Sequence, residues 1–201
     1  MKKRSFLSAS MAGALAAGSA ALPARAAAPA GRKPLPGPVL LTVSGRIGAG
    51  NRGPLDPALD QMMAKQKIAF DRAQVFDFAA LAALPAVAIR PTLEYDGKPH
   101  ALKGPLLRDV MAACGVRATG NTQFFLRAVD GYAAQIAAAE AEKYRFIVAT
   151  HLDGQPMALG GLGPLWAVYE PDRFADMAAR PLSERFALCP WATYHIEVRE
   201  G

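Results

Sequence analysis

Short runs of apolar residues, separated by glycine, proline and aspartate, follow one another along the chain from residue 39 onward. Runs of this length are typical of short strands. The pattern predicts strands at 39–47, 122–129, 146–151, 165–169 and 192–198, with shorter extended pieces at 68–70 and 75–76.

Helices are predicted where capping residues precede an apolar face. Asp56-Pro57 supplies an N-cap followed by a proline at the first helical position. Gly104-Pro105 opens a second helix, which Gly115 ends. The predicted helices are 57–66, 77–85, 105–114, 137–144 and 171–178.

Two Asp-Gly pairs indicate tight turns. Asp96-Gly97 predicts a hairpin between 87–94 and 98–103, because both central residues tolerate positive φ. Asp153-Gly154 turns the chain back toward Met157. Short strands mixed with short helices, without regular βαβ alternation, favour an α+β fold with mixed sheets.

The N-terminal residues predict an export signal. Lys2-Lys3-Arg4 is a charged start, 6–22 is apolar, and Ala24-Arg25-Ala26 is a small-x-small cleavage site. Serines and glycine or proline interruptions make 6–22 a weak membrane span, so we expect residues 1–26 to be removed without leaving a span. The stretch around Arg4 also resembles a twin-arginine (Tat) motif with lysine in place of the first arginine, which leaves Tat and Sec export both open. The expected location is the bacterial periplasm.

The charge distribution separates this signal from one folded domain. The net charge is +6, and residues 1–38 hold six basic and no acidic residues, so the rest of the chain sums to zero (6 − 6). A neutral domain has no long-range attraction for phosphate backbones, which excludes nucleic acid as a partner. Residues 27–38 are a Pro/Gly/Ala linker, and 39–201 is long enough for one domain with a core.

Cys114 and Cys189 leave two alternatives open. They form a disulfide in the oxidising periplasm, or they pack as two buried thiols. Two cysteines and three scattered histidines have no metal-ligand spacing, so no metal site is predicted.

Residues 48–53 match the dinucleotide fingerprint GxGxxG. Pro54 and Pro57 follow, and no βαβ unit surrounds the motif, so we interpret it as a surface loop rather than a nucleotide site.

No nucleophile with an adjacent base is evident, and no catalytic residue is predicted. His100 is expected to be exposed on the hairpin, and His195 to be a satisfied sheet residue. His151, at the end of an apolar strand, is the best candidate among the three for a functional histidine. If the strands 122–129 and 146–151 are neighbours, the polar residues at their ends line one cleft mouth; otherwise they are solvated turn residues. These candidate ligand-binding residues are Arg127, Asp130, Tyr132, His151 and Asp153.

A series of short motifs occurs in order along residues 39–199. They are 41–45 (LTVSG), 77–85 (DFAALAALP), 103–110 (KGPLLRDV) with Gly115, 130–132 (DGY), 148–149 (VA) with 153–157 (DGQPM), and 163–165 (GPL). The series resembles the molybdopterin-binding domain of the sulfite oxidase family. The resemblance implies an α+β domain that holds a molybdenum–pterin cofactor and oxidises or reduces small oxygen-bearing substrates.

The chain departs from the family where the cofactor would be held. The resemblance implies a molybdenum-ligating cysteine between Ile89 and the helix at 105–114, but 90–103 contain none. The family's His-Gly-x-Pro-x-Arg stretch reads LGPLWA at 162–167, and the phosphate-binding lysine segment before a Trp reads FALCPW at 186–191. Without a thiolate and cationic donors, the metal and the pterin phosphate lose their partners, so no cofactor is expected.

The sequence therefore predicts a non-catalytic periplasmic binding module, in which the vacated cofactor cleft recognises a small ligand or a partner protein. One alternative is a molybdopterin-dependent oxidoreductase with atypical ligation, through Cys189. Another is an accessory subunit of an envelope signalling or redox complex, with Trp166, Tyr169 and Trp191 as interface anchors.

Overall fold

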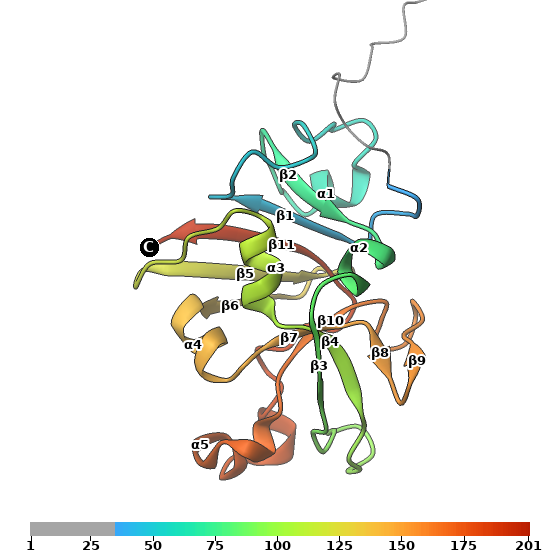
Figure 1. The fold of residues 1–201 in the computed structure, drawn as a ribbon, viewed down its shortest axis with the longest axis vertical. Coiled ribbons are helices and arrows are strands. Elements are labelled where there is room, and N and C mark those ends of the chain that lie inside the picture. The colour runs from blue at the N-terminus through green and yellow to red at the C-terminus, as the bar shows by residue number, and fades with distance from the viewer. Residues whose placement is uncertain (1–34) are drawn as a thin grey trace, which may run out of the picture. The chain divides into compact units, whose positions relative to one another are not determined.

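Short strands and short helices follow each other in an irregular order in the computed structural model, which describes residues 35–201 (Figure 1). The predicted α+β class with mixed sheets is confirmed. The predicted signal at 1–26 and most of the linker lie outside the described residues. Within 35–201, none of the helices is long and apolar enough to cross a membrane.

The largest sheet has five strands in the order β2–β1–β11–β5–β6. β1 and β11 run parallel, and the other neighbours run antiparallel. This sheet therefore joins the first strand of the domain to the last one. Its members are β1 (Leu41–Gly45), β2 (Ala73–Phe76), β5 (Thr122–Ala128), β6 (Ala133–Ala137) and β11 (Thr193–Glu200).

Two smaller sheets lie next to each other through β4 and β7. One has the order β3–β4–β8–β9, and the other pairs β10 with β7. A Cβ atom on Gly104 in β4 would lie 1.9 Å from the carbonyl oxygen of Val148 in β7, so only glycine allows this approach. The strands are β3 (Ala86–Ile89), β4 (Leu102–Pro105), β7 (Ile147–Ala149), β8 (His151–Leu152), β9 (Gln155–Pro156) and β10 (Trp166–Val168).

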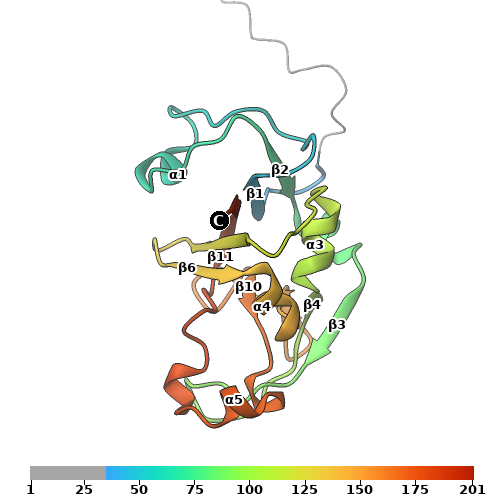
Figure 2. The same ribbon diagram turned by 90° about the vertical axis from the view of Figure 1, so that its left-hand side faces the viewer.

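The helices are short and lie around the sheets. In both views α5 lies at the opposite end of residues 35–201 from α1 (Figures 1 and 2). The α-helices are α1 (Gln61–Lys65), α2 (Phe78–Ala82), α3 (Leu107–Ala113), α4 (Ala138–Lys143) and α5 (Ala175–Ala178), with 3₁₀ turns at Pro171–Arg173 and Leu182–Glu184.

Several predicted elements need correction. The strand predicted at 146–151 is two strands in different sheets, because the chain changes partner at Thr150. β6 was not predicted at all. Asp96-Gly97 lies in a wider loop than the two-residue hairpin turn that was predicted. The loop spans 94–97, and the amide of Leu93 donates to the carbonyl of Lys98 at 2.9 Å across its base.

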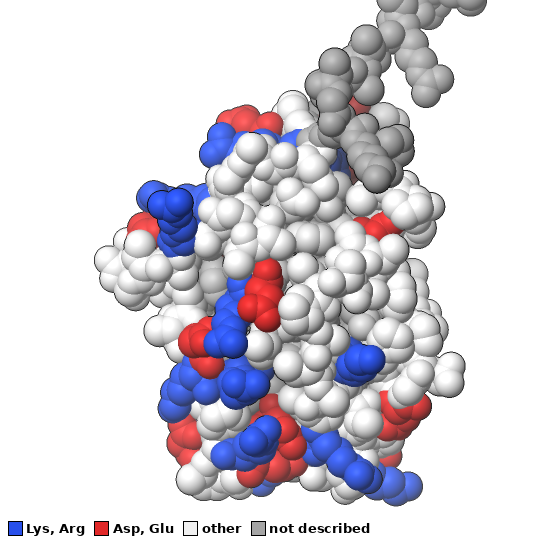
Figure 3. All heavy atoms as spheres, in the orientation of Figure 1, with Lys and Arg blue, Asp and Glu red and all other residues white. Residues whose placement is uncertain are grey.

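The main core lies between the sheets and includes the largest fully buried side chains among residues 35–201. Trp166 and Tyr169 are buried there, and the ring of Phe146 stacks on Tyr169 at 4.8 Å. Neither residue is therefore available as an interface anchor, whereas Trp191 is at the surface. On the face drawn in Figure 3, basic and acidic side chains are interspersed, in keeping with the neutral net charge of the domain.

Candidate ligand-binding site

The five predicted site residues lie in three separate settings. β5, which carries Arg127, pairs with β11 and β6, whereas β8, which carries His151, pairs with β4 and β9. The two strands are therefore not neighbours, and the premise that would have gathered all five residues at one cleft mouth is wrong. Asp130 and Tyr132 lie in the turn after β5, and Asp153 lies in the turn after β8.

Arg127 belongs to a polar group enclosed on the five-stranded sheet. It lies opposite His195 in the ladder, and its guanidinium is 3.7 Å from the carboxylate of Glu197. The Nε2 atom of His195 is 2.9 Å from the hydroxyl of Ser44. His195 Nδ1 and Arg127 Nε have no hydrogen-bond partner among the described residues, so His195 is only half satisfied, contrary to our expectation.

The environment of His195 keeps the imidazole neutral. Burial, and then the charge of Arg127, lower the pKa of His195 from 6.5 to about 4. Ser44 and His195 are both fully buried, and the ring of Phe70 stacks over the imidazole at 6.4 Å. The Ser–His contact therefore has no access for a substrate, and we assign it to structure.

Asp153 is engaged by a histidine that the sequence did not suggest. Its carboxylate accepts from the backbone amide of Ala101 at 2.9 Å and lies 2.7 Å from His100 Nδ1. His100 Nε2 is 3.0 Å from the carboxylate of Asp96. The hydrogen bonds that His100 donates to Asp153 and then to Asp96 raise the pKa of His100, and the pKa values of both carboxyl groups are lowered in return.

This group, His100 between Asp96 and Asp153, fastens the hairpin at 90–103 to the turn after β8. We name it the histidine clasp. His151 does not take part: its Nδ1 is 2.8 Å from the hydroxyl of Thr150, and its ring packs against Phe78 at 5.4 Å.

Asp130 and Tyr132 form a link between distant segments. The carboxylate of Asp130 accepts from the backbone amide of Tyr132 at 2.8 Å, which shapes the turn. The Tyr132 hydroxyl donates to the carbonyl oxygen of Ala187 at 2.5 Å. The turn after β5 is thereby held against the segment 183–191.

These two segments and the tip of the hairpin enclose a pocket of about 310 Å³. Its walls include two of the segments where the chain departs from the family, 90–103 and 186–191, and the Asp-Gly-Tyr motif, but no residue of 162–167. We name it the aromatic–acidic pocket. It is lined by Glu94, Tyr95, Ala128, Asp130, Tyr132, Ser183, Phe186, Ala187, Cys189, Pro190 and Trp191.

Three aromatic side chains around this pocket are exposed to solvent. Tyr95 is 56% exposed, Tyr132 is 50% exposed and Trp191 is 38% exposed. They are the aromatic members of the exposed large apolar residues in the described part of the chain. Because water-exposed aromatic surface is unfavourable, a cluster of this kind is typical of a binding site.

The pocket is acidic. Its lining residues include Glu94 and Asp130 and no lysine or arginine. Partial desolvation of the half-exposed phenol, and then the charge of Glu94, raise the pKa of Tyr95 from 10.0 to about 12, so the phenol stays neutral well above physiological pH. The nearby cation Arg185 is committed to Asp172 at 2.8 Å and to backbone carbonyls.

No protein-family model and no curated protein sequence matches the chain. Among solved structures, its fold is similar to the crystal structure of the sulfane dehydrogenase SoxCD from Paracoccus pantotrophus, with a TM-score of 0.53 and 11% sequence identity. The match covers 80% of this chain and 38% of that chain, so this chain spans well under half of its length. The likeness shows the fold alone, and it agrees with the sulfite oxidase-like fold that the motifs predicted.

The residues of the pocket do not fit a molybdenum–pterin cofactor. Cys189 is the sulfur in its wall, but this side chain is buried, and burial raises the pKa of its thiol far above physiological pH. A soft metal needs the thiolate, and a pterin phosphate needs cationic donors, which the lining does not supply. Cys114 is also a buried free thiol, at the C-terminus of α3, so the structure has the two thiols unpaired.

The glycine-rich motif packs against the edge of β2. The amides of Asn51 and Arg52 donate to the carbonyl of Ala73, and a Cβ on Gly50 would lie 2.5 Å from the same oxygen. Gly50 also has a φ of +69°, so glycine is required here by the backbone rather than by a nucleotide.

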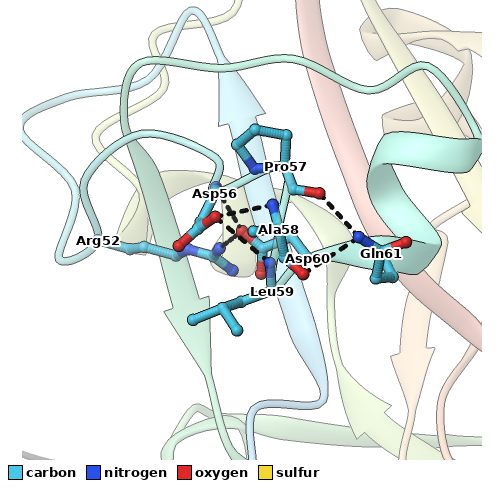
Figure 4. Close-up of polar contacts among 7 residues, drawn as sticks. All are labelled: Arg52, Asp56, Pro57, Ala58, Leu59, Asp60 and Gln61. Atoms are coloured by element: carbon cyan, nitrogen blue, oxygen red, sulfur yellow. Dashed lines mark hydrogen bonds and ion pairs between the residues drawn. The ribbon is translucent and has the colours of Figure 1, made fainter.

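In the segment after this motif, the polar side chains bond to one another and to the local backbone (Figure 4). Arg52 forms an ion pair with Asp60, and the Asp56 carboxylate accepts from the amide of Ala58 at 2.8 Å. Asp56 therefore caps a turn at 57–59 instead of the helix predicted to start there, and α1 begins at Gln61. Because Arg52 is committed to Asp60, it does not reach toward a phosphate.

A larger hollow of about 490 Å³ lies elsewhere, beside the C-terminal ends of β1 and β11. Arg46, Arg72 and Arg117 line it together with Glu200. It contains none of the predicted site residues, and the three arginines are too dispersed in sequence for a motif to reveal them.

Proposed function

We propose that this protein is a ligand-binding module of the bacterial periplasm, built on a sulfite oxidase-like fold and working without the molybdenum–pterin cofactor. The aromatic–acidic pocket is its binding site. The observation that carries the proposal is the gathering of Tyr95, Tyr132 and Trp191, all exposed, around one cavity. Two of the three segments where the chain departs from the family, 90–103 and 186–191, contribute to its walls, which carry carboxylates and no lysine or arginine.

The geometry favours binding over catalysis. Tyr132 is bonded to a backbone carbonyl, the phenol of Tyr95 is held neutral, and the Cys189 thiol is buried. None of these groups is prepared to act as a nucleophile or base at physiological pH. The cavity volume of about 310 Å³ suits a small molecule.

The first experiment identifies the ligand. Protein purified from the periplasm is analysed by native mass spectrometry, and the apo protein is then screened by thermal shift against periplasmic metabolites. We expect a ligand that raises the melting temperature with a concentration dependence set by its Kd. The Trp191→Ala variant removes the shift, whereas Leu59→Ala, an exposed apolar residue outside the pocket, keeps it. A shift that survives Trp191→Ala and Tyr95→Ala would place the site elsewhere.

Export is tested separately. Fractionation of cells that produce the full chain, with N-terminal sequencing of the mature protein, should yield a periplasmic product that begins after residue 26. A product that stays in the cytoplasm with residues 1–26 attached would contradict the periplasmic part of the proposal.

A second candidate is a molybdopterin-dependent oxidoreductase with atypical ligation through Cys189. The fold similarity to a sulfane dehydrogenase favours it, but it requires the buried Cys189 thiol to become exposed and ionised. Molybdenum quantification on the native periplasmic protein decides between the two. Stoichiometric molybdenum that is lost in a Cys189→Ser variant would establish the enzyme and end the binding-module proposal.

A further inference from the structure

We infer that the aromatic–acidic pocket recognises an organic cation: a small molecule with a positively charged ammonium group. The inference rests on the proposed function and adds the chemical class of the ligand. It follows from the charge and the side chains of the pocket lining.

The two carboxylates of the pocket have no basic partner. Neither Glu94 nor Asp130 forms an ion pair with a lysine, arginine or histidine among residues 35–201. Asp130 is exposed and accepts one hydrogen bond, from the amide of Tyr132, so its charge is balanced by water rather than by a cationic side chain. A ligand that displaces water from these two carboxylates removes their solvation, and a positive charge on the ligand compensates that cost directly.

The aromatic residues favour the same kind of ligand. Ammonium groups are attracted to the faces of tryptophan and tyrosine rings, and several such rings around one cavity recognise quaternary ammonium compounds. Tyr95, Tyr132 and Trp191 come from three different segments and all three line this pocket. An anion would meet two carboxylates with no cation to receive it.

Other ligand classes fit the lining less well. A flat neutral ligand would use the rings but would leave both carboxylates partly desolvated and unpaired. The arginine-lined hollow near β1 and β11 has the opposite charge and no exposed aromatic residue, so it does not compete for the same ligand.

The test compares a cation with its neutral isostere. Choline and 3,3-dimethylbutan-1-ol have nearly the same shape, and they differ in the charge of the branched head group. Calorimetric titrations of the mature protein use this pair, together with putrescine as a second cation and glucose as a neutral ligand that stacks on aromatic rings. We expect at least one cation to bind about tenfold more tightly than the isostere or glucose. That preference should shrink as the salt concentration rises.

Charge-neutral variants of the two carboxylates test whether their charge causes the preference for cations. Glu94→Gln and Asp130→Asn keep size and hydrogen-bonding ability, and each should weaken the cation about tenfold while leaving the isostere unchanged. Glu184→Gln, which changes a carboxylate near the pocket that is not part of its lining, serves as the matched control.

The outcomes separate this inference from the proposed function. Equal binding of choline and its isostere, or a cation affinity that Glu94→Gln and Asp130→Asn leave unchanged, would overturn the organic cation. A neutral metabolite that binds in a Trp191-dependent way, with no response to either cation, would overturn the inference and keep the binding module. If neither these probes nor the metabolite screen gives a ligand, both are wrong.

Discussion

The hydroxyl of Tyr132 donates a hydrogen bond of 2.5 Å to the backbone carbonyl of Ala187, 55 residues away in the sequence. The turn after β5 and the segment 183–191, which form two walls of the aromatic–acidic pocket, are joined by this contact. The ring of Tyr132 is itself half exposed at the pocket. One side chain therefore both shapes the pocket and offers an aromatic surface to a ligand.

Removing this hydroxyl should reduce the affinity for the ligand strongly and the stability of the fold only slightly. Tyr132→Phe keeps the ring and should lower the free energy of unfolding by about 1 kcal/mol or less, because the hydrogen bond is partly exposed. The affinity for the pocket ligand should fall, since segment 183–191 is no longer held. Chemical denaturation and calorimetric titration measure the two effects.

Tyr194→Phe is the matched control for that variant. The Tyr194 hydroxyl donates to the side-chain oxygen of Gln66 at 2.8 Å, outside the pocket. This variant should lose similar stability with unchanged affinity. Equal losses of affinity in both variants would show that the Tyr132–Ala187 contact has no special role at the site.

The buried His195 predicts a loss of stability in mild acid. Its pKa is about 4 in the folded protein against an ordinary value of 6.5 when unfolded, so between these values the unfolded chain binds a proton that the folded one does not. Stability therefore falls as pH drops from 6.5 toward 4, by up to about 3 kcal/mol. Carboxyl groups with lowered pKa values contribute at lower pH, because their contribution begins to disappear only near their ordinary pKa, which is 3.8 for Asp60 and Asp176 and 4.5 for Glu197.

Urea denaturation at several pH values between 4.5 and 7 measures this effect. His195→Gln retains a polar group near Ser44 and has no proton to gain, so its stability should be nearly flat over the same range. Arg127 and Glu197 lie beside position 195 in both proteins and provide the same background. Parallel pH profiles of the wild type and the variant would rule out His195 as the origin.

The strands that the sequence predicted well are those whose apolar residues are buried. Residues 122–129 and 192–198 match β5 and β11 closely, because a central strand needs apolar side chains on at least one face. β6 was missed, since its sequence AAQIA is mostly alanine and only Ile136 is a good strand former. The division of 146–151 at Thr150 has no local signal, because it depends on which strands lie on either side.

The site was predictable only in part. Of the segments that the resemblance pointed to, 90–103, 130–132 and 186–191 contribute to the pocket and 162–167 does not, and two of the five predicted residues, Asp130 and Tyr132, line it. Tyr95 is not among the predicted residues and Trp191 is predicted only as an interface anchor, because an exposed aromatic residue looks the same in sequence as a buried one. Glu94 is not predicted, because a lone glutamate beside a turn has no distinguishing pattern. The histidine clasp was missed since it depends on the pairing of β4 with β8, which brings His100 to Asp153.

The clasp should make the hairpin more mobile at high pH. The pKa of His100 is raised, so its contribution to stability is complete below 6.5 and is lost as pH rises through the raised value. The hairpin tip that it fastens carries Glu94 and Tyr95, which line the pocket. Backbone ¹⁵N relaxation at pH 6 and pH 9 should show increased motion of residues 93–98 at the higher pH.

The His100→Ala variant removes the clasp. At pH 6 its residues 93–98 should be as mobile as those of the wild type at pH 9, and the disordered hairpin tip should weaken ligand binding. His151→Ala is the control, because that histidine contacts Thr150 and Phe78 rather than the two clasp carboxylates. Identical relaxation of residues 93–98 in the wild type and His100→Ala would contradict a clasp.

The two cysteines should be unreactive in the folded protein. Both are buried and free, and burial raises the pKa of Cys114 to about 12 and that of Cys189 still further. A thiol reacts as its thiolate, so a disulfide-exchange reagent should label neither residue before unfolding and both afterward. Dithiothreitol should leave the melting temperature unchanged. Protein from the periplasm whose mass is 2 Da below that of the reduced chain, and which loses stability on reduction, would instead have a Cys114–Cys189 disulfide. In that case the folded arrangement of α3 and the pocket wall would have to differ from the one described.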